Sequence, residues 1–92
     1  MFIFNETHTR LINLNMVEQI KVGCCPSGDA LLNSEEQTAW IELIFTDGSP
    51  CKVVEFDRRS NALRVLEMIK DRIRNHDETI DMLNLKSIVE SI

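Results

Sequence analysis

Glycine, proline and aromatic residues are scarce in this chain, and their scarcity removes several classes of protein. Among 92 residues there are three glycines, two prolines, one tryptophan and no tyrosine. The sequence has no glycine-rich loop to hold a nucleotide phosphate, and no serine with the flanking glycines of a hydrolase nucleophile elbow. We therefore expect neither an enzyme nor a bound cofactor.

Long hydrophobic runs are also missing. No apolar stretch approaches the roughly 18 residues that a membrane span needs, and the apolar start at residues 2–4 is too short for the core of a signal peptide. The sequence thus predicts a cytoplasmic protein with no membrane partner.

Cysteine is present in a number that does not suit a disulfide framework. The three cysteines are Cys24, Cys25 and Cys51, and an odd count leaves one unpaired. Structural zinc sites need ligands two to four residues apart, so adjacent cysteines do not match them. His8 and His76 lie far apart in the sequence, and a hydrogen-bonded structural histidine is a more common role for His76 than a metal ligand. We expect reduced thiols and no metal, with a redox switch at Cys24 and Cys25 as the alternative.

The overall composition is that of an ordinary globular protein. Hydrophobic residues make up 43% of the chain and charged residues 27%, and this length suits one domain covering residues 1–92. The net charge of −5 repels nucleic acid and anionic membranes at long range, so neither is an expected partner.

Two strand-like runs precede the clearest helical pattern. Residues 11–22 alternate between apolar and polar side chains, with a turn or bulge near Asn15, and residues 38–56 fold back at Asp47 and Gly48. A short edge strand is possible at residues 2–4. One face of the second run is apolar and predicts a core: Ala39, Ile41, Leu43 and Phe45.

An amphipathic helix is predicted over residues 60–75. Its apolar positions recur at spacings of three and four, with Val65 beside them: Ala62, Leu66, Ile69 and Ile73. We expect Ser60 as the N-cap, because a cap at Asp57 would place arginines in the first turn, where the helix dipole disfavours them.

The C-terminal stretch allows two interpretations. The apolar stripe could continue through His76, Ile80 and Leu83 as one long helix. Alternatively Asn75 ends the first helix and Asp77 caps a second one within residues 77–92. We favour the second interpretation, because the second helix would have its own apolar stripe: Met82, Leu85, Ile88, Val89 and Ile92. The expected fold class is α+β, a small antiparallel meander of three to five strands within residues 2–56, with the helix on one face and a further helical segment.

Several apolar residues exceed what so small a sheet covers. Trp40 and Ile44 point away from the predicted core face, and a 92-residue chain gains from sharing a core. We therefore expect a homodimer that uses the C-terminal segment, the alternative being docking within one chain. The possible interface residues are Trp40, Ile44, Ile80, Leu83, Leu85, Val89 and Ile92.

Basic residues gather between residues 58 and 74. The possible anion-binding residues are Arg58, Arg59, Arg72 and Arg74. Arg64, Glu67, Asp71 and Arg74 alternate in sign at helical spacing, however, which is typical of a solvated helix face.

Two family resemblances accompany these patterns. The order INLNMVEQIKV, IELIFTDGSPCKVVEF and NALRVLEMI, within residues 10–73, resembles small bacterial and phage domains of pleckstrin-homology-like form. That resemblance implies a binding or assembly role without catalysis. The same strand, hairpin and helix order is similar to LytTR-type DNA-binding domains, which net acidity disfavours. We expect a non-enzymatic protein-interaction or assembly module, with anion or nucleic-acid binding through residues 58–74 as the alternative.

Overall fold

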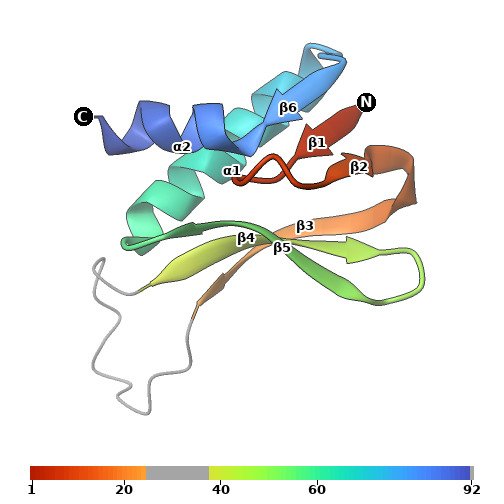
Figure 1. Cartoon of the computed structure of the whole chain (residues 1–92), viewed down its shortest axis with the longest axis horizontal. Helices are drawn as coiled ribbons and strands as arrows, with labels where there is room; N and C mark the ends of the chain where they lie inside the picture. Colours follow the sequence, from red (N-terminus) through yellow and green to blue (C-terminus); the bar gives the residue numbers. More distant parts are fainter. Residues whose placement is uncertain (25–37, 92) are drawn as a thin grey trace.

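The computed structural model describes residues 1–24 and 38–91, and its elements form two small sheets and two helices (Figure 1). Cys25 and Ile92, both considered above, lie outside the described residues. The elements in chain order are β1 (Phe2–Phe4), β2 (Leu11–Asn13), a 3-10 turn (Leu14–Met16), β3 (Val17–Cys24), β4 (Ala39–Phe45), β5 (Pro50–Phe56), α1 (Arg59–Arg74), β6 (Thr79–Asp81) and α2 (Met82–Glu90).

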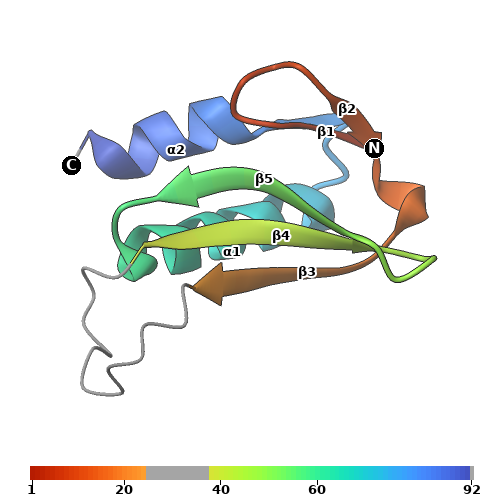
Figure 2. The same cartoon turned by 60° about the horizontal axis from the view of Figure 1, so that its bottom comes forward.

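The main sheet is the predicted meander, with strand order β3-β4-β5 and antiparallel pairing throughout. Figures 1 and 2 show α1, α2 and the small sheet on the same side of it. Ala39, Ile41 and Leu43 face that side and are fully buried, as predicted, while Phe45 is half-buried at the end of the strand. The opposite face carries no described helix.

The predicted hairpin joins β4 to β5. Gly48 has a φ of 90°, which the missing side chain makes accessible. The Asp47 carboxylate accepts hydrogen bonds from the Ser49 backbone N–H at 2.8 Å and from its hydroxyl at 2.6 Å. These contacts hold the turn that the Asp-Gly pair predicts.

The small sheet has strand order β2-β1-β6, and the sequence did not predict it. β1 pairs with β2 antiparallel and with β6 parallel, so that Ile3 lies between Ile12 and Ile80. Residues 11–22 were expected as one strand with a break. They form β2, a 3-10 turn and β3, and the turn sends β2 and β3 into different sheets.

Helix α1 places Ala62, Val65 and Ile69 against the main sheet. Leu66 is half-buried, and Ile73, which the sequence predicted in the core, is 39% exposed. The predicted N-cap at Ser60 is also wrong. The helix begins at Arg59, its N-cap is Arg58, and no side chain among residues 1–24 and 38–91 caps it.

The end of α1 is a Schellman motif built without glycine. Asn75 is the C-cap, as predicted, and His76 adopts a left-handed φ of 58°. The His76 N–H donates to Ile73 at 3.1 Å, and the Asp77 N–H donates to Arg72 at 3.1 Å. His76 is therefore exposed at a turn, and the alternative of one long helix with His76 on its apolar stripe is wrong.

The second helix of the favoured interpretation exists, but it begins later than predicted. Asp81 is the N-cap of α2, and its carboxylate accepts from the Leu83 and Asn84 N–H groups at 3.0 and 3.4 Å. Asp77 does not cap it. The residues between Asp77 and α2 include strand β6, which forms hydrogen bonds with β1 at the N-terminus.

The α+β class is confirmed, with a helix at the C-terminus after the strands. No helix within residues 1–24 and 38–91 has both the length and the apolar content of a membrane span.

Candidate functional site: an open strand edge and the groove beside it

Three of the predicted interface residues belong to the protein's own core. Ile80, Leu85 and Val89 are at most 4% exposed, packed with α1 and the strands. Docking within one chain, the alternative to a partner, accounts for these side chains. The interface prediction is wrong for these three residues because β6 and α2 fold back onto the remainder of the molecule.

The other predicted interface residues do not form one surface. Trp40 and Ile44 are half-buried on the uncovered face of the main sheet, whereas Leu83 is 42% exposed at the start of α2, on the opposite side of that sheet. The remaining residue, Ile92, lies outside the described part of the chain.

The four arginines proposed for anion binding are also separated. Arg58 and Arg59 lie at the start of α1, and Arg72 and Arg74 lie at its end, roughly 20 Å away at 1.5 Å per residue. Arg72 pairs with Asp77 at 3.4 Å and Arg74 pairs with Asp71 at 3.6 Å. The structure therefore divides the predicted patch into two ends.

A polar cavity of about 610 Å³ lies at the first turn of α1. Arg58 and Arg64 contribute positive charge to its wall, while Asp57 and Glu90 contribute negative charge. Its other lining residues are Ser60, Asn61 and Val89. The mixed charge makes this cavity a weaker anion site than the sequence suggested.

The outer edge of β3 is the most distinctive surface of the described chain. Phe45 N–H donates to Ser49 in the hairpin at 2.9 Å, and Thr46 N–H donates to Met16 at 3.0 Å on the β3 side. Peptide groups alternate in direction along an antiparallel strand. The Phe45 N–H points to β5, so the peptide groups of Ile44 and Glu42 point to β3. Gln19 and Lys21 pair with these two residues, and the peptide groups of Gln19 and Lys21 therefore face β4.

The N–H and C=O groups of Ile20 and Val22 consequently face away from the sheet. No backbone hydrogen bond from another described residue reaches them. The opposite edge of the sheet differs, because Glu6 N–H donates to the Val53 carbonyl at 2.9 Å on the outer side of β5. Figure 2 shows β3 at a margin of the sheet with no described element beyond it.

An apolar groove of about 350 Å³ adjoins this edge. It lies where β3 meets the 3-10 turn and the last turn of α1, and Glu18 is the only charged side chain that the described residues contribute to it. Its remaining lining residues are Met1, Leu14, Asn15, Val17, Gln19, Ile20 and Ile73. Free peptide groups beside apolar pockets are what an added strand requires.

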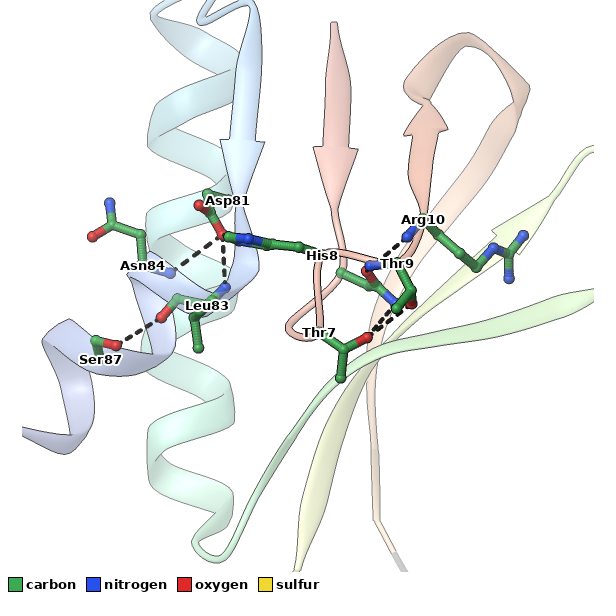
Figure 3. A network of polar contacts seen from close by, with 9 residues as sticks. Thr7, His8, Thr9, Arg10, Asp81, Leu83, Asn84 and Ser87 are labelled. Atoms are coloured by element: carbon green, nitrogen blue, oxygen red, sulfur yellow. Dashed lines mark hydrogen bonds and ion pairs between the residues drawn. The ribbon is translucent and has the colours of Figure 1, made fainter.

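A second polar cluster ties the N-terminal loop to α2 (Figure 3). His8 Nε2 lies 2.8 Å from Asp81 Oδ1, the oxygen that also caps α2. Partial burial acts to raise the pKa of Asp81, but the hydrogen bonds from His8, Asn84 and Leu83 outweigh it, so this pKa lies below its ordinary value. The cluster is a structural tie between distant segments.

Lys86 and Glu6 form another tie between the same segments. Their Nζ and Oε2 atoms are 2.8 Å apart, and both side chains are half-buried. Burial acts to lower the pKa of Lys86, yet the hydrogen bond and the charge of Glu6 raise it overall. With His8 and Asp81, this pair holds α2 against the loop that follows β1.

Chemistry-bearing clusters are few among residues 1–24 and 38–91. No group of three or more possible metal ligands comes together there. Cys51 is buried, with Arg10 Nη1 3.0 Å from its sulfur, and Cys24 is exposed at the end of β3.

The groove was not predicted from the amino-acid sequence, although one signal for it was present. The alternating pattern of residues 11–22 slips near Asn15, and the structure places a 3-10 turn there and a bulge at Glu18. Which edge stays open depends on strand order, which this local pattern does not contain. Comparison of the chain with protein-family models, curated proteins and solved structures finds no match.

Proposed function

We propose that this chain is a non-enzymatic interaction module that binds an extended segment of a partner protein along β3. The observation that carries the proposal is the outward-facing peptide groups of Ile20 and Val22 beside the apolar groove. An added strand would satisfy these groups and place alternate side chains in the groove.

The energetics suit modest, reversible binding. Each new backbone hydrogen bond contributes about 0.5–1.5 kcal/mol net, and burying apolar surface contributes about 25 cal/mol per Å². Ile73 is 39% exposed at the groove and has surface to bury. The pleckstrin-homology-like resemblance, which stays a prediction, also implies binding without catalysis.

A proline at Val22 tests the proposal. Proline lacks an N–H and is tolerated where that group points away from the ladder. We expect Val22→Pro to leave the hydrogen bonds of Lys21 and Gly23 to β4 in place. It should bind a labelled peptide of alternating valine and threonine at least tenfold more weakly, measured by fluorescence anisotropy.

Glu55→Pro is the matched control. The N–H of Glu55 points to the outer side of β5, at the other margin of the sheet, by the same alternation. The Glu55→Pro variant should bind the peptide with the same affinity as the parent protein. Ile73→Ser, which alters the groove and not the strand, should weaken binding. Equal affinity in all three variants and the parent would contradict strand addition at β3.

A homodimer, predicted from the sequence, is the competing occupant of this edge, because the C-terminal core residues cannot form its interface. Two copies could pair through β3, because open strand edges also associate with each other. Light scattering measures the mass of the protein in solution. Concentrations on the order of 10 to 100 µM are suitable, because weak interfaces dissociate in this range. A dimer formed through this edge would disappear in Val22→Pro and persist in Glu55→Pro.

Anion binding at the first turn of α1 is the second candidate. The cavity there is lined by Arg58, Ser60, Asn61 and Arg64, and no side chain of the described residues caps the helix. Binding of phosphate or an oligonucleotide should fall steeply with salt and be lost in Arg58→Ala combined with Arg64→Ala. Salt-insensitive or absent binding would remove this candidate.

A further inference from the structure

Charges on the uncovered face of the main sheet alternate in sign from strand to strand. Lys52 on β5 lies opposite Glu42 on β4, and Glu42 lies opposite Lys21 on β3. Lys21 Nζ is 3.6 Å from Glu42 Oε2. Lys52 turns instead to Glu55, at 2.9 Å, and to the Trp40 ring.

Lys21 is the last charge of this row and lies on the strand whose outer edge has no backbone partner among the described residues. Its side chain is 47% exposed. A residue directly opposite Lys21 on an added strand would lie on the same face, within reach of the ammonium group. An acidic residue there would continue the alternation.

The neighbours of Lys21 point to the other face. Ile20 and Val22 pair with Leu43 and Ile41 and are half-buried on the side of α1. Ile20 also lines the apolar groove. Residues opposite these two positions on an added strand would therefore need apolar side chains.

We propose that the segment recognised along β3 has an acidic residue between two apolar residues, with the acidic residue opposite Lys21. This inference rests on strand addition at β3. The inner edge of β3 already holds such a pattern, because Leu43, Glu42 and Ile41 of β4 occupy those three positions. The outer edge offers the same sequence of side chains to a partner.

A second copy of the chain suits this edge less well than such a segment. In an antiparallel pair centred on Lys21, two ammonium groups would face each other, which destabilises a cross-strand pair. The whole chain also carries a net charge of −5, so two copies repel.

Three labelled peptides test the inference. All alternate valine and threonine, and they differ only in a central Val-Glu-Val, Val-Gln-Val or Val-Lys-Val. We expect the parent protein to bind the glutamate peptide about fivefold more tightly than the lysine peptide, because opposite charges attract and like charges repel across strands. The preference should shrink in high salt.

Charge reversal provides the decisive comparison. Lys21→Glu should invert the preference, and Lys21→Gln should remove it while keeping the sheet free of a new repulsion with Glu42. Lys52→Glu is the matched control, since it makes the same charge change on the same face, two strands away, and should leave the order of the peptides unchanged.

The outcomes separate this inference from the function on which it rests. Equal binding of all three peptides by the parent, lost in Val22→Pro, would overturn the acidic preference and leave strand addition intact. No binding of any peptide would overturn both. A doubled mass that disappears in Val22→Pro and persists in Glu55→Pro would show a second copy at the edge and would also overturn the inference.

Discussion

Gly23 and Trp40 face each other across β3 and β4, and their fit depends on the absence of one methyl group. A Cβ atom at Gly23 would lie 2.5 Å from Trp40 Nε1 and 2.7 Å from Cε2. The indole N–H is buried and has no hydrogen-bond partner among the described residues, while Lys52 Nζ lies 4.3 Å from the ring centroid. Trp40 therefore covers the glycine and is held by packing.

Gly23→Ala should displace the indole ring. Overpacking of this kind costs about 1–3 kcal/mol, measured by urea unfolding, and the fluorescence of Trp40, the only tryptophan, should shift. Gly48→Ala is the control. It also destabilises the protein, because of its φ of 90°, but nothing lies within 4 Å and the fluorescence should not change. An unshifted spectrum in Gly23→Ala would contradict the contact.

Asp81 gives the protein a predictable loss of stability in acid. The pKa of Asp81 in the folded protein lies below its ordinary value. The ionised carboxylate therefore stabilises the fold at a pH above the ordinary pKa, and this stabilisation is lost as the pH falls through the lowered pKa. Asn is as good an N-cap as Asp. Asp81→Asn should therefore lower the free energy of unfolding at pH 6. The variant should also lose less stability than the parent protein when the pH falls from 6 to 3.

The effect should be below about 1 kcal/mol, because the pair with His8 is partly exposed and solvent screens it. Asp47 also has a lowered pKa, but it contributes equally to both proteins. Parallel stability curves for the parent and Asp81→Asn over this pH range would contradict the assignment. In a protein that carries His8→Gln, the difference in stability between the protein with Asp81 and its Asp81→Asn variant should be smaller, because the partner of the carboxylate is gone.

At the scale of elements, helix α1 ends through residues that sequence rules do not single out. A left-handed residue after the C-cap is usually glycine, and here it is His76. An L-residue in this conformation costs about 1–2 kcal/mol. Glycine avoids this cost but loses more conformational entropy on folding, which offsets part of the gain. The helix thus keeps its Schellman bonds in spite of the residue.

His76→Gly should stabilise the protein by about 0.5–1 kcal/mol, raising the melting temperature by a few degrees. Asn75→Gly is the control, because Asn75 has a φ of −82° and no strain to relieve. It should be neutral or destabilising. A lower melting temperature for His76→Gly would show that the imidazole makes a contact that outweighs the backbone strain.

At the scale of the whole molecule, the C-terminal segment completes the core. β6 bonds to β1, and α2 packs on α1, β5 and β1. Four side chains in this segment are at most 4% exposed: Ile80, Met82, Leu85 and Val89. Burying each is worth about 1.5–3 kcal/mol, so together they approach the stability of a typical domain.

Truncation after Glu78 should therefore abolish cooperative folding, seen as loss of a thermal transition in circular dichroism. Leu83→Ala is the control within the same helix, because this side chain is 42% exposed. It should change stability by less than about 1 kcal/mol. A truncated protein that melts like the parent would contradict the place of β6 and α2 in the core.

The sequence by itself determined the elements that rest on local chemistry. The alternating apolar residues in Ala39–Phe45, the Asp-Gly turn and the helix α1 each depend on neighbours a few positions apart. The strand, the turn and the existence of the helix are confirmed. The buried face of the helix consists of Ala62, Val65 and Ile69, whereas the predicted core residue Ile73 is exposed. The division of the C-terminal region into two helical parts was also predictable, since a second stripe of apolar residues begins at Met82.

The tertiary structure alone decided how distant segments meet. β6 is a three-residue strand that gains its hydrogen bonds from β1, more than 70 positions away, so no local pattern predicts it. That pairing buries Ile80 and moves it from the expected interface to the core. The same reason applies to the candidate site. A strand edge is open or closed according to what packs beside it, and this depends on the folded chain as a whole.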